Sequence, residues 1–223
     1  PAIALLGFSN IKTNKEYFVE QSVKRKEQRT LTDHLRIIFS DSLIWAGTVL
    51  NNWGITPNVL TMTGVFGSAI GAVIVGSGNF VLGGFIIMLM GPLDALDGAV
   101  ARVRGEPEDF GAFVDSVSDR YIEILIYGGL LWYYFTQENL LAVMLIFFAV
   151  TGSIMVSYMR ARAQSLGFEA KVGILTRVER LLVIGPSILF NYPLVGVMIV
   201  AVFSNITAFQ RIFHVRQESR NRQ

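Results

Sequence analysis

Long apolar runs, separated by short polar clusters, occupy most of the chain from residue 54 onward. Six of the runs come close to the roughly 20 residues that an α-helix needs to cross a bilayer. The segments that join them alternate between short turns rich in turn-forming residues and longer segments that carry charge. The pattern predicts an all-α integral membrane protein with six transmembrane helices, at about 58–77, 80–104, 109–136, 138–166, 173–190 and 192–213.

Residues 31–53 show a different periodicity. Apolar residues such as Leu35 and Phe39 recur at helical spacing, opposite charged residues such as Arg36. A helix divided in this way is expected to lie at the membrane surface with its apolar face buried, so we predict an N-terminal amphipathic juxtamembrane helix. The chain then divides into a cytoplasmic N-terminal segment or linker, this helix, a six-helix membrane domain and a cytoplasmic tail: residues 1–30, 31–53, 54–213 and 214–223.

The composition agrees with a membrane protein and excludes several kinds of site. Of the 223 residues 52% are hydrophobic, and the mean hydropathy is +0.49, which is more apolar than a soluble domain of this size needs. The absence of cysteine excludes a disulfide framework, a thiolate metal site and a cysteine nucleophile. The two histidines, His34 and His214, lie in polar flanking regions, so we do not expect a histidine-based zinc or catalytic site.

The positions of the positive charges predict the topology. The 19 Lys and Arg residues are absent from three stretches, 37–101, 121–159 and 181–210. A chain that crosses the bilayer and returns around each stretch, with helix ends that continue into the flanking residues, keeps every positive charge on one side. By the positive-inside rule that side is the cytoplasm. We therefore expect a multi-pass protein of the cell membrane with both termini in the cytoplasm.

Four aspartates lie near the cytoplasmic ends of two neighbouring spans. Asp94 and Asp97 are three residues apart near the end of the second span, and Asp115 and Asp119 are four apart near the start of the third. On helices the members of each pair share one face, and the antiparallel spans bring both pairs to a similar depth. Acidic residues inside a membrane are costly and are candidates for function.

The chemistry of these acids points to a divalent cation. Four converging carboxylates repel one another unless a cation neutralises them, and an all-oxygen ligand set favours Mg²⁺, Mn²⁺ or Ca²⁺ over zinc. One alternative is a set of inter-helix salt bridges, although the nearby arginines, Arg102, Arg104 and Arg120, are fewer than the acids. The other local alternative is a pathway for cation transport.

The aspartates belong to a longer pattern that resembles the signature of the CDP-alcohol phosphotransferases, also called CDP-alcohol phosphatidyltransferases. That signature is Asp-x2-Asp-Gly-x2-Ala-Arg-x8-Gly-x3-Asp-x3-Asp. Its eight fixed positions are all present, as Asp94, Asp97, Gly98, Ala101, Arg102, Gly111, Asp115 and Asp119. The six-span layout and the Pro57-Asn58 entry to the first span also resemble the family, over about residues 31–213.

The resemblance implies a metal-dependent transferase of phospholipid biosynthesis, with its active site on the cytoplasmic side. In the family a CDP-linked lipid, usually CDP-diacylglycerol, gives its phosphatidyl group to an alcohol and releases CMP. Carried over by position, Asp119 is the catalytic base, and the ligands of two Mg²⁺ or Mn²⁺ ions are Asp94, Asp97, Asp115 and Asp119. The CDP-binding residues are then Asp94, Asp97, Gly98, Ala101, Arg102, Gly111 and Asp115. The physical roles agree, because a metal clamp neutralises a diphosphate and a carboxylate takes a hydroxyl proton.

A group of arginines bears on the acceptor alcohol. Arg160 ends the fourth span, and Arg177 and Arg180 share one face at the start of the fifth. They fit ordinary cytoplasmic flanking charge and equally a pocket for a phosphorylated acceptor, since arginine suits phosphate. The stretch 158–182 resembles the branch that makes phosphatidylinositol phosphate or its archaeal counterpart, archaetidylinositol phosphate, from inositol phosphate. That resemblance assigns the acceptor phosphate to Arg160 and to either Arg177 or Arg180, and glycerol-3-phosphate stays an alternative acceptor.

The remaining expectations concern partners and competing functions. The resemblance suggests a homodimer surrounded by membrane lipid, and no nucleic acid is expected as a partner. An intramembrane prenyltransferase also uses paired aspartates and Mg²⁺, but the Gly-x2-Ala-Arg element and the spacing to Gly111 argue against it. A cation transporter would need polar groups farther across the membrane. An upstream soluble domain, such as the nucleotidyltransferase of some family members, is compatible with the sequence.

Overall fold

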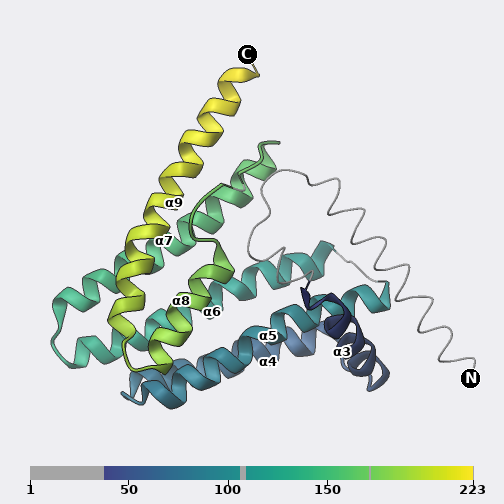
Figure 1. Ribbon diagram of the computed structural model, residues 1–223, viewed down its shortest axis with the longest axis horizontal. Coiled ribbons are helices and arrows are strands. Elements are labelled where there is room, and N and C mark those ends of the chain that lie inside the picture. The colour runs from purple at the N-terminus through teal and green to yellow at the C-terminus, as the bar shows by residue number, and fades with distance from the viewer. Residues whose placement is uncertain (1–37, 106–108, 171, 223) are drawn as a thin grey trace, which may run out of the picture. The chain divides into compact units, whose positions relative to one another are not determined.

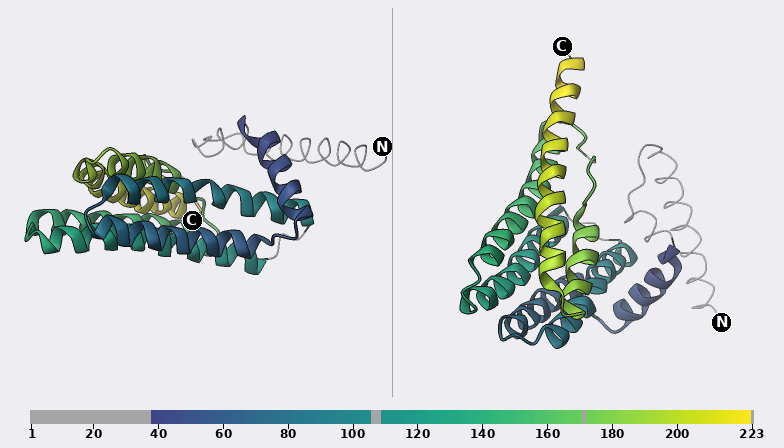
Figure 2. Two further views of the ribbon diagram at one scale, coloured as in Figure 1. Left: turned by 90° about the horizontal axis from the view of Figure 1, so that it is seen from below. Right: turned by 60° about the vertical axis from the view of Figure 1, so that its left-hand side comes forward.

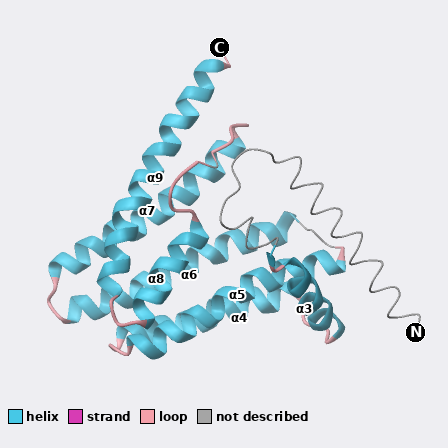
Figure 3. Cartoon of the chain, viewed as in Figure 1, coloured by secondary structure: helices cyan, strands magenta, loops and turns pink. Residues whose placement is uncertain are grey.

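The structure, a computed structural model, describes residues 38–105, 109–170 and 172–222. Over these residues the chain is helical without any strand (Figure 1), and loops or turns join the helices, the longest described one lying between α7 and α8 (Figure 3). The seven helices are α3 (Ser40–Asn52), α4 (Pro57–Gly76), α5 (Phe80–Arg104), α6 (Asp109–Thr136), α7 (Leu140–Ser165), α8 (Arg177–Leu189) and α9 (Pro193–Asn221). The predicted segment 1–30 and the first part of the juxtamembrane helix, 31–37, lie outside the described residues.

Each of the six predicted spans corresponds to one helix, from α4 to α9, and the local sequence explains where the helices begin. Pro57 and Pro193 are the first residues of α4 and α9, where a missing backbone N–H has no consequence. The Asn139 side chain caps α7 by accepting a hydrogen bond from the Ala142 N–H at 3.0 Å. Asn191, in the predicted turn before α9, adopts a positive φ of 66°, which suits asparagine.

Two helix ends differ from the prediction. The fifth helix begins at Arg177 instead of residue 173, because Gly173 has φ +137° and Thr176 is extended, so neither continues a helix. The last helix continues past residue 213 to Asn221. Its polar end has no helix-breaking residue, since neither Gly nor Pro occurs between 213 and 221.

Four of the described helices, α4, α5, α7 and α9, are long and apolar enough to cross a membrane. The other two predicted spans do not meet that standard. In α6 the charged residues Asp119, Arg120 and Glu123 occur within five positions, and α8 has 13 residues, fewer than the roughly 20 that a perpendicular crossing needs. The protein is therefore a membrane protein that is all-helical over its described residues, and the count of six spans is not confirmed.

The chain divides into two packing units, and α5 belongs to both. In the first, residues 38–57 and 95–105, helix α3 packs against the last part of α5. A Cβ atom at Gly47 would lie 3.0 Å from the backbone of Ala99, so glycine is what permits this approach. Arg104 adds a hydrogen bond of 2.7 Å from its Nε to the side-chain oxygen of Asn51.

The second unit contains residues 58–94, 109–170 and 172–222. Within it α9 lies with α7 on one side and α8 on the other (Figure 2, right). Asn205 ties α9 to α7 through a hydrogen bond of 3.1 Å to the carbonyl oxygen of Phe148. A Cβ atom at Gly71 of α4 would lie 2.8 Å from Cγ1 of Ile87 in α5. The absence of a side chain at Gly71 therefore allows the two helices to pack closely. The apolar core of this unit includes Ile87, Leu130, Ile146, Ile188 and Val197.

Candidate active site

Two helices of the second unit bring motif aspartates together. Asp94 comes from α5, and Asp115 and Asp119 come from successive turns of α6. Carboxylate oxygens of Asp94 and Asp115 lie within 4.8 Å of one another, and Asp94 and Asp119 contact the same guanidinium group. Asp97 follows Asp94 by one turn of α5, so helical spacing gives the two a common face, and Asp97 is buried.

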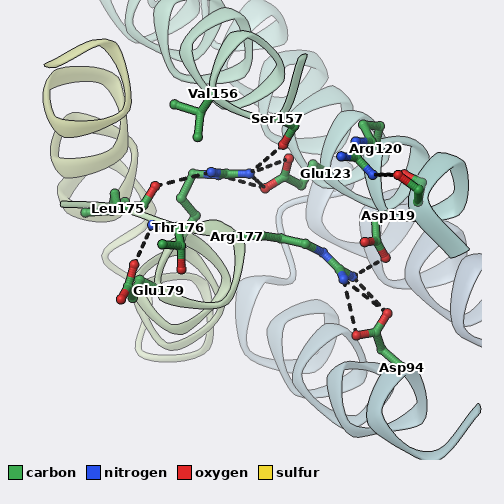
Figure 4. Close-up of polar contacts among 12 residues, drawn as sticks. Asp94, Asp119, Arg120, Glu123, Val156, Ser157, Leu175, Thr176, Arg177 and Glu179 are labelled. Carbon is green, nitrogen blue, oxygen red and sulfur yellow. Dashed lines mark hydrogen bonds and ion pairs between the residues drawn. The ribbon is translucent and has the colours of Figure 1, made fainter. Parts of the chain in front are cut away.

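The shared guanidinium group belongs to Arg177. Its Nη1 donates to both carboxylate oxygens of Asp94, at 3.1 and 3.2 Å, and its Nη2 contacts Oδ1 of Asp94 and of Asp119. Figure 4 shows the Arg177 side chain extending from α8 toward both acids. The side chains of Arg177 and Asp94 are 29% and 33% exposed, whereas that of Asp119 is 10% exposed. The Arg177–Asp94 pair is therefore partly accessible to solvent, whereas Asp119 is largely enclosed.

Arg180 lies one turn farther along α8 in a different environment. Its side chain is 1% exposed and forms hydrogen bonds of 2.9 and 3.1 Å with the two carboxylate oxygens of Glu123 in α6. It also donates to the Leu175 carbonyl oxygen and the Ser157 hydroxyl. A buried charge needs such partners, so in this structure Arg180 and Glu123 form an inter-helix ion pair that joins α6, α7 and α8.

The other residues of the motif lie on α5 and α6 in different surroundings. A Cβ atom at Gly98 would lie 3.3 Å from Nη1 of Arg102, so the arginine lies over the glycine one turn away on the same helix. A Cβ atom at Gly111 would meet no described atom within 4 Å, so packing does not require glycine there. Ala101 is partly buried, and Arg160, at the end of α7, is exposed to solvent.

The arrangement of the acids fits a divalent metal ion. Mg²⁺ binds oxygen ligands at about 2.0–2.1 Å, so two ligands of one ion are separated by at most about 4.2 Å. The oxygens of Asp94 and Asp115 lie within 4.8 Å of one another, which is close to that limit, so both acids are candidates to bind one ion. When bound, such an ion neutralises phosphate oxygens and polarises the phosphorus. Asp119 adds a buried carboxylate that can accept a proton next to that position.

Sequence reasoning did not single out two residues of α9 that support this site. Thr207 and Arg211 are buried and bind the backbone of the segment that leads into α8. The Arg211 Nε donates to the Val172 carbonyl oxygen at 3.0 Å, and its Nη1 contacts the Val156 carbonyl oxygen. One signal was present in the sequence: Arg211 is the first charged residue after a long uncharged run, and it ends the apolar part of α9.

Comparisons with known proteins agree with this geometry. The chain matches the family model of CDP-alcohol phosphatidyltransferases over residues 54–210. It is 37% identical over 172 residues to the archaetidylinositol phosphate synthase of Pyrococcus horikoshii. The aligned region covers 77% of this chain and 89% of that protein. Its structure is similar to the crystal structure of Mycobacterium tuberculosis phosphatidylinositol phosphate synthase with CDP-DAG bound, with a TM-score of 0.73 and 30% identity over 78% of this chain and 92% of that one. A structure of the same mycobacterial enzyme in complex with manganese and citrate matches with a TM-score of 0.73 and 29% identity, over 78% and 88% of the two chains.

Proposed function

Since the chain belongs to the CDP-alcohol phosphatidyltransferase family, we propose that it transfers a phosphatidyl or archaetidyl group from a CDP-linked lipid to inositol phosphate. A hydroxyl oxygen of inositol phosphate attacks the phosphorus that carries the lipid. The new oxygen–phosphorus bond forms as the diphosphate bond breaks, and CMP leaves. The hydroxyl proton goes to a carboxylate of the enzyme, so charge and atoms balance.

One observation carries the proposal: Asp94 of α5 and Asp119 of α6 converge on the single cationic group of Arg177. The acid proposed for the donor, the acid proposed for the proton and the side chain proposed for the acceptor phosphate are therefore in contact with one another. Arginine binds carboxylate and phosphate with the same bidentate geometry, so the group that now pairs with Asp94 is suited to an acceptor phosphate.

The motif residues divide into donor and proton roles. Asp94, Asp97 and Asp115 would hold the metal, and Asp119 would be the catalytic base and could contact a second ion. The cytidine and diphosphate would lie along the surface formed by Asp94, Asp97, Gly98, Ala101, Arg102, Gly111 and Asp115. Two observations support this assignment: a Cβ atom at Gly111 would have no neighbour among the described residues, and the Arg102 guanidinium lies over Gly98. A diphosphate needs open space and a cation.

The acceptor phosphate is assigned to Arg160, Arg177 and Arg180. Arg177 and Arg160 are accessible to solvent, so they would contact the phosphate, and Arg180 would contribute through its buried charge while it remains paired with Glu123. The names of the relatives support inositol phosphate over other acceptors, since the archaeal relative is an archaetidylinositol phosphate synthase and the mycobacterial one a phosphatidylinositol phosphate synthase.

The proposed setting is the cell membrane. Six spans, with the termini and active site on the cytoplasmic side, would place all the Lys and Arg clusters in the cytoplasm. In that arrangement α6 and the segment 173–190, which contains α8, would cross the bilayer, and the charges of α6 would have partners such as Arg180. A homodimer is part of the proposal through the family resemblance. Mg²⁺ or Mn²⁺, as two ions, would serve as the cofactor.

The test is CMP release by the purified full chain in detergent with Mn²⁺ or Mg²⁺. The donors are CDP-diacylglycerol and its archaeal ether counterpart, and separate reactions contain inositol phosphate, glycerol-3-phosphate, inositol or serine. Of the four acceptors, we expect only inositol phosphate to support CMP release. We expect CMP release to stop when EDTA removes the metal. Asp109→Asn, an exposed acid in the first turn of α6 outside the motif, is the matched control and should retain full activity.

Each other result is informative. Release with glycerol-3-phosphate instead would reassign the acceptor and leave the reaction class intact. Release that persists in EDTA would refute the metal requirement. Absence of CMP release with every donor and acceptor, from protein that is folded by circular dichroism, would refute the proposed function.

A further inference from the structure

Helix α9 holds the loop that leads into the candidate site. This loop follows α7 and reaches α8 at Arg177. Thr207 of α9 is 0% exposed, and its hydroxyl oxygen accepts hydrogen bonds from the backbone N–H groups of Ile174 and Leu175, both at 3.2 Å. A single side-chain oxygen thus satisfies two successive backbone donors immediately before α8.

The backbone around this contact is fitted closely to Thr207. Gly173 has φ +137°, a conformation that side chains rarely adopt, and a Cβ atom there would collide with Cγ2 of Thr207. Four residues later on α9, Arg211 binds the Val172 carbonyl oxygen at 3.0 Å. Adjacent turns of α9 therefore fix consecutive peptide groups of the loop, from the Val172 carbonyl to the Leu175 N–H.

The contact has a direct consequence for Arg177. Only Thr176 separates Leu175 from Arg177, and Thr176 is held by a hydrogen bond from its backbone N–H to the Glu179 carboxylate. Once the Leu175 N–H is fixed, the start of α8 is fixed, and with it the base of the side chain that reaches Asp94 and Asp119.

We propose that Thr207 is a positioning residue for the acceptor site. Its hydroxyl oxygen holds the backbone N–H groups of Ile174 and Leu175, so that Arg177 is placed to bind the phosphate of the acceptor alcohol. This inference rests on the proposed function, since it assumes that Arg177 binds that phosphate. Thr207 itself touches neither substrate nor metal. Donor binding depends on α5 and α6, so it should be independent of Thr207.

The experiment compares Thr207→Val, which keeps the shape and removes the acceptor oxygen, with Thr207→Ser, which keeps the oxygen. Displacement of a positioning group by about 1 Å can cost up to about 100-fold in rate. Because the loop retains its Arg211 contact, we expect a smaller effect, a rise of about fivefold in the KM for inositol phosphate. The KM for the CDP-linked lipid should stay within about twofold, and Thr207→Ser should restore the acceptor KM.

The control variant is Ser204→Ala. Ser204 is also fully buried in α9, one turn before Thr207, and its hydroxyl has no hydrogen-bond partner among the described residues. It should leave both KM values unchanged. Hydrogen exchange of the peptide that contains residues 174 and 175 gives a second measurement that needs no activity, and it should rise in Thr207→Val alone.

The outcomes separate the two proposals. An unchanged acceptor KM in Thr207→Val, or an equal rise in both KM values, would overturn the positioning role even if the wild type makes the expected product. Unchanged hydrogen exchange would show that Thr207 does not hold the loop. A wild type that is inactive with every phosphorylated acceptor would overturn the proposed function and this inference with it. Failure of the proposed function can be distinguished from failure of the positioning role, because only in the former would Thr207→Val still raise hydrogen exchange at residues 174 and 175.

Discussion

Arg177 and Arg180 lie one turn apart on α8, and both bind carboxylates of other helices, yet their surroundings differ. The Arg177 side chain is 29% exposed and forms ion pairs with two acids of the motif, Asp94 and Asp119. Arg180 is 1% exposed, binds Glu123 through both carboxylate oxygens and has two further partners. The Arg177–Asp94 pair is partly accessible to solvent, whereas the Arg180–Glu123 pair is buried.

The difference follows from desolvation. A buried charge that loses its partner pays the full penalty of desolvation, so the Arg180–Glu123 pair is fixed once α6 and α8 have packed. A partly exposed pair is stabilised only weakly, because water and salt screen it. Arg177 can therefore exchange Asp94 for a phosphate more readily than Arg180 can leave Glu123, provided that a metal ion compensates Asp94 and the buried Asp119. Under the proposed function, Arg177 would therefore bind the acceptor phosphate directly, whereas Arg180 mainly joins helices through Glu123.

The largest expected effect is on the motif side of this comparison. Replacing Asp119 by Asn removes the base and keeps the shape of the side chain, and a general base typically contributes 10²–10⁴-fold. We expect kcat to fall by about 10³-fold with the melting temperature nearly unchanged, measured by CMP release and thermal denaturation in saturating Mn²⁺. If Asp119 served only as an ion-pair partner of Arg177, most of the activity would remain and the protein would melt earlier.

The next effect concerns the closed pair. Arg180→Ala leaves Glu123 as an uncompensated buried charge, which typically costs about 3–5 kcal/mol, so we expect the melting temperature to fall by about 10 °C. A double variant, Arg180→Met with Glu123→Leu, should recover most of that loss because it removes both charges. A single variant as stable as the wild type would show that Arg180 is not a structural residue.

The smallest effect is expected at the exposed pair. Arg177→Ala removes a charge-assisted hydrogen bond to the acceptor phosphate, worth about 1.5–3 kcal/mol, so the KM for inositol phosphate should rise at least about tenfold. In saturating Mn²⁺ the ion compensates Asp94 and Asp119, so the melting temperature should stay within about 2 °C. A large loss of stability with an unchanged acceptor KM would reverse the roles assigned to the two arginines.

The sequence predicted much of this protein. Hydrophobic periodicity located six helices to within a few residues at most ends, and it correctly predicted the all-helical membrane class. The resemblance to the CDP-alcohol phosphotransferases is confirmed by the match over residues 54–210. That membership decides against the prenyltransferase and cation-transporter alternatives, which the aspartates by themselves had left open. The number of membrane spans stays a prediction, since α6 carries charge and α8 is short.

The arginines show where sequence reasoning ended. Arg177 and Arg180 have the same charge and lie on the same face of one helix, so the sequence did not decide which of them holds the acceptor phosphate. What distinguishes them is the presence of Glu123 beside one and of Asp94 beside the other. These contacts join residues 57 and 83 positions apart, a separation that no local pattern reports.

The sequence by itself determined the helices, the membrane class and the eight-residue motif, because hydrophobic periodicity and fixed spacing along one chain are local properties. Only the tertiary structure decided which charges are closed off and which stay available. It also decided that Thr207 and Arg211 of α9 support the start of α8. The physical reason is that burial and hydrogen-bond partnership depend on which helices pack together, and a residue's role follows from those neighbours as much as from its own chemistry.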